Sequence, residues 1–201
     1  MAAERIVRHA RDAAPDIISP SRTPTVLHIG CNRKDKSFLP ETLQSYREIR
    51  LDIDPRVDPD VLADMRDLSQ LEDNSVDAIF SSHNIEHIFI HEVVPTLTGW
   101  HRVLRPGGFL DLRCPDIELA CRMLLEKGAL ENLYTSPAGP VTAIDIIYGL
   151  TNSIRRGNTF MAHNCGFTED VLSACLKRAG FRRGKIDRNA ARYELRALVY
   201  K

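Results

Sequence analysis

Short apolar runs alternate along the chain with segments in which apolar residues repeat at helical spacing. The runs at 25–29, 48–54, 61–64, 76–80 and 109–114 have the length and the β-branched content of buried strands. Most of the segments between them suit helices with one buried face. Strands that alternate with helices predict an α/β fold with a doubly wound, mostly parallel sheet.

Two of the helical segments have clear boundaries. Residues 91–104 and 168–180 each place apolar side chains on one stripe, and Thr168 and Gly180 suit the start and the end of the second segment. A weaker helix is expected at 39–45, with its proline in the first turn. The segments at 39–45 and 91–104 therefore connect successive parallel strands.

The C-terminal third of the chain departs from this alternation. Strands are expected at 181–186 and 193–200, and the turn between them is too short for a helix, so they should pair antiparallel at the sheet edge. Residues 116–165 separate the fifth strand from the last helix and include helical patterns at 116–127 and 141–148. We expect this segment to be an insertion that covers the substrate site.

Composition limits the class of protein. A chain of 201 residues with 43% apolar residues can form one domain, and no apolar run approaches the roughly 20 residues of a membrane helix. Five cysteines without a Cys-x-x-Cys pair indicate free thiols in a reducing cytoplasm and no structural zinc. Residues 1–24 are expected to form a capping or lid segment with a short helix at 3–14, and not a signal peptide.

Charge is balanced over the whole chain but not along it. The formal net charge is zero, so we do not expect a nucleic-acid partner. Nine Lys/Arg residues follow position 176, against Asp187 and Glu194. This basic end could face a phosphate or an acidic partner, or it could simply keep exposed edge strands from aggregating.

The first expected strand ends abruptly at Gly30, which allows a tight turn and the close approach of a ligand. In open α/β sheets, ligands bind beyond the carboxyl ends of the strands. Gly30, Cys31 and Asn32 are therefore expected to form the floor of a binding site. Ile53 and Ser82, near the ends of the second and fourth strands, are expected to line the same crevice.

Acidic residues follow the second and third strands. Asp52 lies 22 residues after Gly30, near the spacing at which nucleotide-binding folds place a carboxylate on ribose hydroxyls. Asp64 is placed to accept a hydrogen bond from an adenine amino group, and Met65 to pack on the ring. The alternative for these acids, and for Asp54, is to cap the turn after the strand.

Histidines and a glutamate follow the fourth strand. His83, Glu86 and His87 lie directly after it, and His163 lies near the end of the insertion. Histidine is the usual general base near neutral pH, and Glu86 could orient an imidazole. These four residues are the candidate catalytic groups, although His87 or Glu86 could instead anchor a loop.

The same stretch matches the His-x-x-Glu-His pattern of inverted zinc peptidases, and His91 adds an imidazole at helical spacing. Such a zinc site needs the pattern inside a continuous helix. Here the pattern directly follows an expected strand, so a zinc hydrolase remains a remote alternative and we expect no metal.

The order of six motifs resembles the class I S-adenosylmethionine-dependent methyltransferases, of the methyltransferase type 11 group. The motifs are VLHIGC (26–31), RLDIDP (50–55), LADMRDL (62–68), NSVDAIFSSHNIEHI (74–88), HRVLRPGGFLDLRCPD (101–116) and GFTEDVLSACLKRAGF (166–181). The resemblance implies a Rossmann-like sheet with an antiparallel C-terminal edge, S-adenosylmethionine as cofactor, and a methyl acceptor. It covers roughly residues 25–127 and 166–200.

The chain departs from the family pattern at the first strand end. The family usually has an acid followed by Gly-x-Gly-x-Gly, whereas this chain has His28, Gly30, Asn32 and Lys34. Asparagine can adopt the left-handed conformation, so the loop can keep its shape at Asn32. Arg33 or Lys34 could pair with the carboxylate of the methionine moiety, or could be a solvated part of the loop.

The leading hypothesis is methylation of a small-molecule or sugar-like acceptor. One alternative is an RNA methyltransferase that uses the basic C-terminal strands, and another is a non-catalytic cofactor-binding or partner subunit. The acceptor class rests on the weakest argument, because the fold serves many substrates. Whether the chain forms a homo-oligomer stays open.

Overall fold

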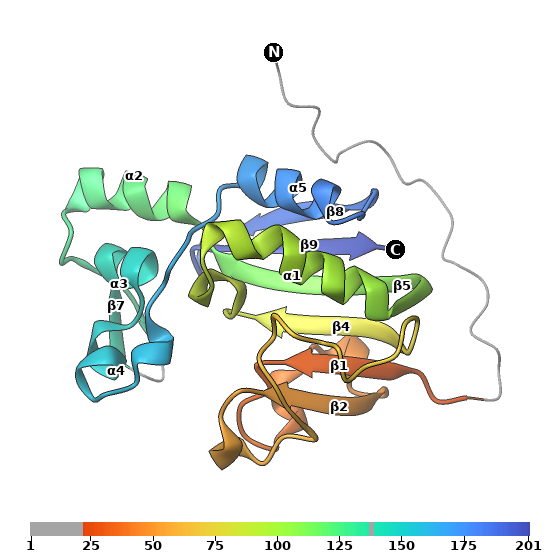
Figure 1. Cartoon of the computed structure of the whole chain (residues 1–201). Coiled ribbons are helices and arrows are strands. Elements are labelled where there is room, and N and C mark those ends of the chain that lie inside the picture. The colour runs from red at the N-terminus through yellow and green to blue at the C-terminus, as the bar shows by residue number, and fades with distance from the viewer. Residues whose placement is uncertain (1–21, 137–138) are drawn as a thin grey trace.

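The computed structural model describes residues 22–136 and 139–201, so the helix expected at 3–14 lies outside the described residues. A seven-stranded sheet forms the centre, in the order β3-β2-β1-β4-β5-β9-β8 (Figure 1). The strands are β1 (Thr25–Ile29), β2 (Arg47–Asp52), β3 (Val61–Leu62), β4 (Val76–Ser82), β5 (Leu104–Pro115), β8 (Arg183–Asn189) and β9 (Glu194–Tyr200).

The strand directions confirm the expected mixed sheet. Strands β1 to β5 are parallel to one another where they pair, β9 runs antiparallel to β5, and β8 runs antiparallel to β9. The antiparallel strand β9 lies between β5 and β8, so β8 forms the edge. All parallel strands therefore place their carboxyl ends on one side of the molecule.

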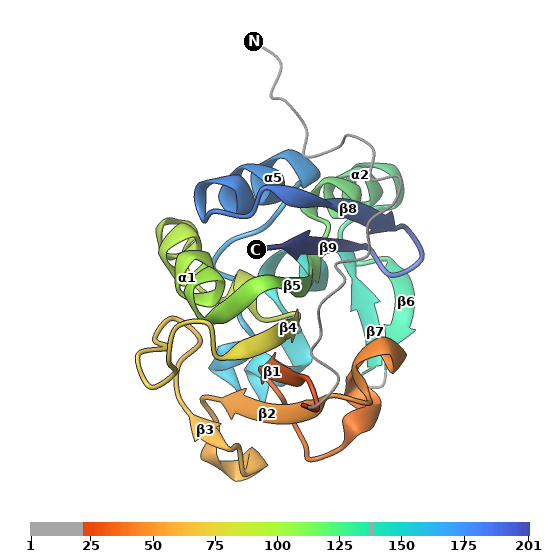
Figure 2. The same cartoon turned by 90° about the vertical axis from the view of Figure 1, so that its right-hand side faces the viewer.

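Two helices cover one face of the sheet, α1 (Ile90–Val103) and α5 (Glu169–Arg178) (Figure 2). Trp100 from α1 and Leu172 from α5 are fully buried in the same core cluster as Leu27 and Ile79 of the sheet. This packing confirms the predicted stripes except at Val171, which was expected on the stripe of α5 and is exposed. Thr168 caps α5 as expected.

The helix expected at 39–45 is absent, and this prediction was wrong. Two 3-10 turns, Lys36–Phe38 and Glu41–Leu43, take its place. A proline disfavours the helical conformation of the residue before it, and Leu39 is extended, so the two turns cannot merge into one helix. The turns still bury Leu43 against the other face of the sheet, in one cluster with Phe80.

The segment 116–165 folds beyond the carboxyl ends of the parallel strands (Figure 1). Its elements are α2 (Ile117–Lys127), β6 (Asn132–Ser136), β7 (Gly139–Thr142), α3 (Ala143–Tyr148), α4 (Thr151–Arg155) and a 3-10 turn (Thr159–Met161). The helix predicted at 116–127 is confirmed. The second one begins only at Ala143, because Thr142 caps it, and the β6–β7 hairpin was not predicted.

The segment leaves and re-enters the core at adjacent points. Asp116 pairs with Phe167 in an isolated parallel bridge, and the amide of Ile117 donates to the carbonyl of Phe167 at 3.0 Å. Asp116 also caps α2, where its side chain accepts from the Leu119 amide. The core therefore continues almost directly from β5 into the stretch of chain that precedes α5.

Within the described ranges, 22–136 and 139–201, every helix is too short or too polar to cross a bilayer.

Candidate active site

The first part of the site is the loop at the end of β1. Gly30 and Asn32 both adopt positive φ angles, +67° and +53°. A Cβ on Gly30 would lie 2.0 Å from Oδ1 of Asn84, so the side chain of Asn84 fills the space that the glycine leaves. Asn84 donates from Nδ2 to the carbonyls of Ile29 and Ser82, both at 3.0 Å. The glycine is therefore required by conformation and by packing.

Asp52 fastens this loop from the end of β2. Its Oδ2 accepts from the Asn32 amide at 3.1 Å, and its Oδ1 accepts from the Asp54 amide at 3.0 Å. The Cys31 thiol also donates weakly to Oδ2, at 3.9 Å. A carboxylate has about four acceptor sites, so Asp52 keeps capacity for a further donor at Oδ1. The capping alternative is realised by Asp54, which accepts from the Arg56 amide at 2.9 Å and caps the next 3-10 turn.

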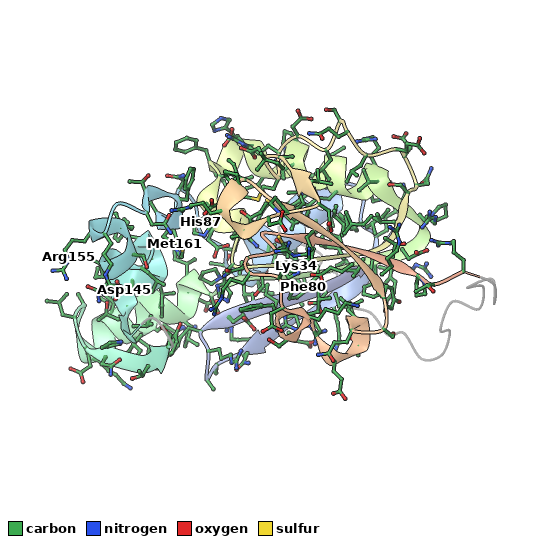
Figure 3. The ribbon with its side chains drawn as sticks, turned by 90° about the horizontal axis from the view of Figure 1, so that it is seen from below. Lys34, Phe80, His87, Asp145, Arg155 and Met161 are labelled. Carbon is green, nitrogen blue, oxygen red and sulfur yellow. The ribbon has the colours of Figure 1, made fainter. Side chains whose placement is uncertain are left out.

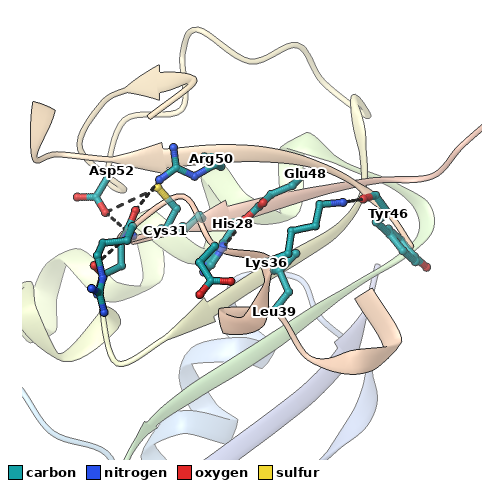
Figure 4. A network of polar contacts seen from close by, with 12 residues as sticks. His28, Cys31, Lys36, Leu39, Tyr46, Glu48, Arg50 and Asp52 are labelled. Carbon is teal, nitrogen blue, oxygen red and sulfur yellow. Dashed lines mark hydrogen bonds and ion pairs between the residues drawn. The ribbon is translucent and has the colours of Figure 1, made fainter. Parts of the chain in front are cut away.

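Arg50 is a site residue that the sequence analysis missed. Its guanidinium is buried and donates to the carbonyls of Asn32 at 2.5 Å, Val57 at 2.9 Å and Asp58 (Figure 4). It thereby ties the β1 loop to the turn after β2. The position of Arg50 between Ile49 and Leu51 in β2 was the available sequence signal, because a buried guanidinium needs several acceptors.

His28 lies beneath the same loop, where it pairs with Glu48. The two side chains are nearly inaccessible, and Nδ1 of His28 is 2.7 Å from Oε1 of Glu48 (Figure 4). Burial is the main cause that lowers the pKa of His28. The neutral ring therefore donates from Nδ1 to the carboxylate, and its role is to support the sheet under the loop.

The remaining cofactor candidates differ in their surroundings. Cys31 is buried, and burial raises its pKa to about 11. Ile53 is exposed, while Met65 packs against the main core and Ser82 is half-buried. The carboxylate of Asp64 accepts a hydrogen bond from Nη2 of Arg66 at 2.6 Å. The expected contact of Asp64 with an adenine amino group stays a prediction. Lys34 is exposed, and its Nζ lies 3.7 Å from Oδ2 of Asp58.

The second part of the site follows β4. His83 has a φ of +56°, an uncommon conformation for a non-glycine residue that often marks functional sites. Its Nε2 lies 3.0 Å from Oε2 of Glu194, and its Nδ1 lies 3.6 Å from Oε1 of Glu86. Burial alone would lower the pKa of His83, but the two carboxylates raise it to about 10. His83 is therefore a cation at neutral pH.

Glu86 is fully buried at the centre of this group. Neither carboxylate oxygen has a hydrogen-bond partner within the part of the chain that the structure describes. Burial raises the pKa of Glu86, but the protonated His83 beside it lowers this pKa by more, so the carboxylate is ionised. A buried carboxylate without donors is costly unless something compensates it.

His163 and His87 complete the group. Nδ1 of His163 lies 3.0 Å from the carbonyl of Ile146, which can only accept, so the proton is on Nδ1 and Nε2 carries a lone pair. That Nε2 lies 3.9 Å from Oε1 of Glu86. Burial lowers the pKa of His163. Nδ1 of His87 lies 3.0 Å from the carbonyl oxygen of Ala162, the residue after Met161 in segment 116–165 (Figure 3).

The structure thus brings together all four candidate catalytic residues, and it adds Glu194 from β9. Glu194 is 111 positions from His83, and no local pattern marked it. The zinc-peptidase geometry is absent here, because Ile85–His87 form a 3-10 turn directly after a strand instead of a continuous helix.

Comparisons with known proteins agree with the motif order. Residues 27–112 match the model of a family described as a methyltransferase domain. No curated protein matches the sequence.

Solved structures share the fold at low sequence identity. A SAM-dependent methyltransferase from Archaeoglobus fulgidus is 17% identical, with 89% of this chain and 86% of that chain covered and a TM-score of 0.56. One from Methanosarcina mazei is 17% identical, with 89% and 92% covered and a TM-score of 0.58. The 1,6-didemethyltoxoflavin-N1-methyltransferase of Burkholderia thailandensis is 16% identical, with 90% and 72% covered and a TM-score of 0.55.

S-adenosylmethionine is the cofactor of this family. The matched residues contain the β1 loop, Asp52 and the segment after β4, whereas His163 and Glu194 lie outside them. Residues 27–112 therefore form a methyltransferase domain of the class I, S-adenosylmethionine-dependent type.

Proposed function

We propose that the protein methylates a small-molecule or sugar-like acceptor held between the end of β4 and the segment 116–165. The observation that carries this proposal is the group formed by His83, Glu86 and His163. In this group the buried carboxylate of Glu86 lies between the imidazole of His83, at the end of β4, and the imidazole of His163, near the end of segment 116–165. Ionisable groups gathered at such an edge favour a reactive site over a structural one.

The donor set at the β1 loop fits the cofactor. Asp52 keeps acceptor capacity for a ribose hydroxyl at Oδ1, which holds one backbone amide, and a second hydroxyl would replace the weak thiol contact of Cys31 at Oδ2. The left-handed loop at Gly30 and Asn32 presents backbone at the floor of the crevice. Asp64 and Met65 would then lie on the adenine side, and Ser82 with Cys31 on the side of the reacting methyl group. Ile53 would contact the ribose edge.

The chain's own residues would handle alignment and the proton. When bound, S-adenosylmethionine supplies a sulfonium methyl that passes to the acceptor heteroatom, while the bonding electron pair stays on sulfur. His163 offers a neutral imidazole whose free Nε2 can take the proton of an acceptor hydroxyl or amine. Glu86 stabilises the imidazolium that results, and protonated His83 offsets the charge of Glu86.

The acceptor class is supported by two further features. The net charge of zero does not favour a polyanionic acceptor. Several basic C-terminal side chains are paired within the protein, since Arg196 pairs with Asp111 at 2.8 Å and Arg188 with Glu118 at 2.7 Å. The same fold holds the small molecule 1,6-didemethyltoxoflavin in the Burkholderia enzyme.

Thermal unfolding with S-adenosylmethionine, with its demethylated product and with NAD tests the cofactor site. A ligand at 100 times its Kd adds about 2.7 kcal/mol, which shifts the Tm of a chain of this size by roughly 5–10 °C. We expect a shift with the first two ligands and none with NAD.

A screen with methyl-labelled cofactor then tests the acceptor class. We expect label in hydroxylated or aminated small molecules, and loss of transfer in His163→Gln with an unchanged cofactor shift. Label found only in RNA, with a rate that falls steeply with salt, would instead establish the alternative acceptor.

A further inference from the structure

The ionisable groups after β4 also share a geometric property that methyl transfer does not need. One oxygen of Glu86 and one ring nitrogen each of His87 and His163 lie within 4.8 Å of one another. Glu86 is buried, and the two histidines are half-buried. Three potential ligand atoms therefore surround one small volume at the carboxyl edge of the sheet.

The atoms that face this volume are electron-rich. Nδ1 of His163 is used by the carbonyl of Ile146, so the lone pair on Nε2 faces Oε1 of Glu86 at 3.9 Å. Glu86 accepts no hydrogen bond at either oxygen from the described residues, and its ion pair with His83 is 3.6 Å long. Two lone pairs that face each other repel, and a cation between them would convert this repulsion into two bonds.

The histidines are also held as metal ligands usually are. A ligating histidine commonly donates its other ring N–H to a carbonyl or carboxylate, which fixes the ring and its tautomer. Nδ1 of His163 has the Ile146 carbonyl at 3.0 Å, and Nδ1 of His87 has the Ala162 carbonyl at 3.0 Å. Nε2 of His87 lies 3.2 Å from the carbonyl of His83, so this nitrogen would have to turn from that carbonyl to the ion. His83 differs, because both of its ring nitrogens face carboxylates.

We propose that Glu86, His87 and His163 bind one divalent transition-metal ion. Two imidazoles and one carboxylate form a ligand set suited to Zn²⁺, Mn²⁺ or Fe²⁺, with at least one position left for water or an oxygen of the acceptor. Ligands at 2.0–2.1 Å in a tetrahedral site lie about 3.3 Å apart. The 3.9 Å between His163 Nε2 and Glu86 Oε1 therefore needs only a small inward movement.

This site departs from the expectation that the chain binds no metal, and it goes beyond methyl transfer. The ion would take the lone pair of His163 that the metal-free enzyme offers as a base, so the two roles exclude each other in one molecule. Metal binding can therefore be measured without an acceptor, and its failure would leave the proposed transfer intact.

The test uses tag-free full-length protein, stripped with a chelator and dialysed separately against Zn²⁺, Mn²⁺ and Co²⁺. Metal content per chain is measured by mass spectrometry after gel filtration, and the Co²⁺ form is examined for the visible absorption of a nitrogen–oxygen site. The variants are His163→Gln and Glu86→Gln. His91→Gln is the matched control, because His91 is an exposed histidine on α1 outside the cluster.

We expect about one metal ion per chain in the wild type and in His91→Gln, and at least a tenfold weaker affinity in both cluster variants. The thermal shift with S-adenosylmethionine, retained in each variant, shows that the fold is intact. The proposal is overturned if no metal binds above the level of a buffer blank. It is equally overturned if both cluster variants retain metal as the wild type does.

Discussion

The two sides of the crevice at the carboxyl edge differ in how completely their polar groups are paired. On the β1–β2 side, Arg50 donates to three carbonyls and both oxygens of Asp52 accept backbone amides. On the β4 side, both oxygens of Glu86 lack a donor within the described chain, and His83 is held in a left-handed conformation. The buried polar groups of the β1–β2 side therefore find partners within the described part of the protein, whereas those of the β4 side do not all find one there.

The side with the unpaired carboxylate depends on a ligand for its charge balance. A paired network is rigid and positions a loop before any ligand arrives. An unpaired buried carboxylate lowers stability, and native proteins keep such groups chiefly where they serve a function. We therefore expect substitutions on the β1–β2 side to affect folding and cofactor affinity, and those on the β4 side to affect transfer.

The largest effect is expected at Glu86. Glu86→Gln should lower methyl transfer to the acceptor found by the label screen by about 100- to 10,000-fold, because the imidazoles lose the charge that orients and stabilises them. Its cofactor affinity should stay within about twofold of the wild type, since no contact joins it to the β1 loop. Single-turnover rates at saturating cofactor measure the first quantity.

Glu92→Gln is the control for this change, because Glu92 pairs with Arg66 on the far side of the turn. Equal losses in both variants would show that the effect is a general one of removing a carboxylate near β4.

Gly30→Ala should lower the free energy of unfolding by about 2–4 kcal/mol, because it adds strain at positive φ and displaces Asn84 from its hydrogen bonds. Gly99→Ala is matched to it, because Gly99 lies within α1 and a Cβ added there would meet nothing within 4 Å. That change should stabilise the protein by about 0.5–1 kcal/mol. Urea denaturation measures the free energy of unfolding of both variants. A similar loss of stability in the two would contradict the packing argument.

Asp52→Asn should weaken cofactor binding by about 10- to 100-fold, because a neutral amide accepts less strongly from ribose hydroxyls. Asp54→Asn should change the affinity by less than about threefold, since Asp54 is already bound by Arg56 at 2.7 Å. Titration calorimetry with the demethylated cofactor measures both, and a larger loss in the second variant would reverse the assignment.

The smallest effect concerns pH and His28. Its folded-state pKa lies below the ordinary 6.5, so the unfolded chain binds the proton more readily and stability falls as the pH falls below about 6.5. At pH 5.5 this loss is at most about 1.4 kcal/mol. His28→Gln should flatten the change in unfolding free energy between pH 7.5 and 5.5, and an unchanged slope would place the titrating group elsewhere.

Much of the fold could be predicted because its elements are encoded locally. The stripe with Trp100, the cap at Thr168 and the approximate positions of the apolar strands depend on neighbours within a few residues, and all three are confirmed. The exception at 39–45 was also local in origin, since one proline was enough to replace a helix by two turns. The hairpin of β6 and β7 has few buried residues and correspondingly weak patterning.

The candidate site was less predictable because its groups meet through the tertiary fold. Spacing led to Asp52 and the local motif to Glu86, but Glu194 reaches His83 only because β9 pairs with β5. Arg50 and Asn84 satisfy carbonyls whose positions no local pattern gives. The chemical roles of the four candidate catalytic residues stay predictions.

The bridge between Asp116 and Phe167 has a consequence for how this enzyme can diversify. Because the chain leaves and rejoins the sheet at the same place, the residues between these two positions form a cassette with nearly coincident ends. A segment whose two ends lie side by side can become longer, become shorter or be replaced at little entropic cost to the core. The cassette can therefore change while the strands of the sheet remain as they are, and under the function proposed above such a change would alter the acceptor.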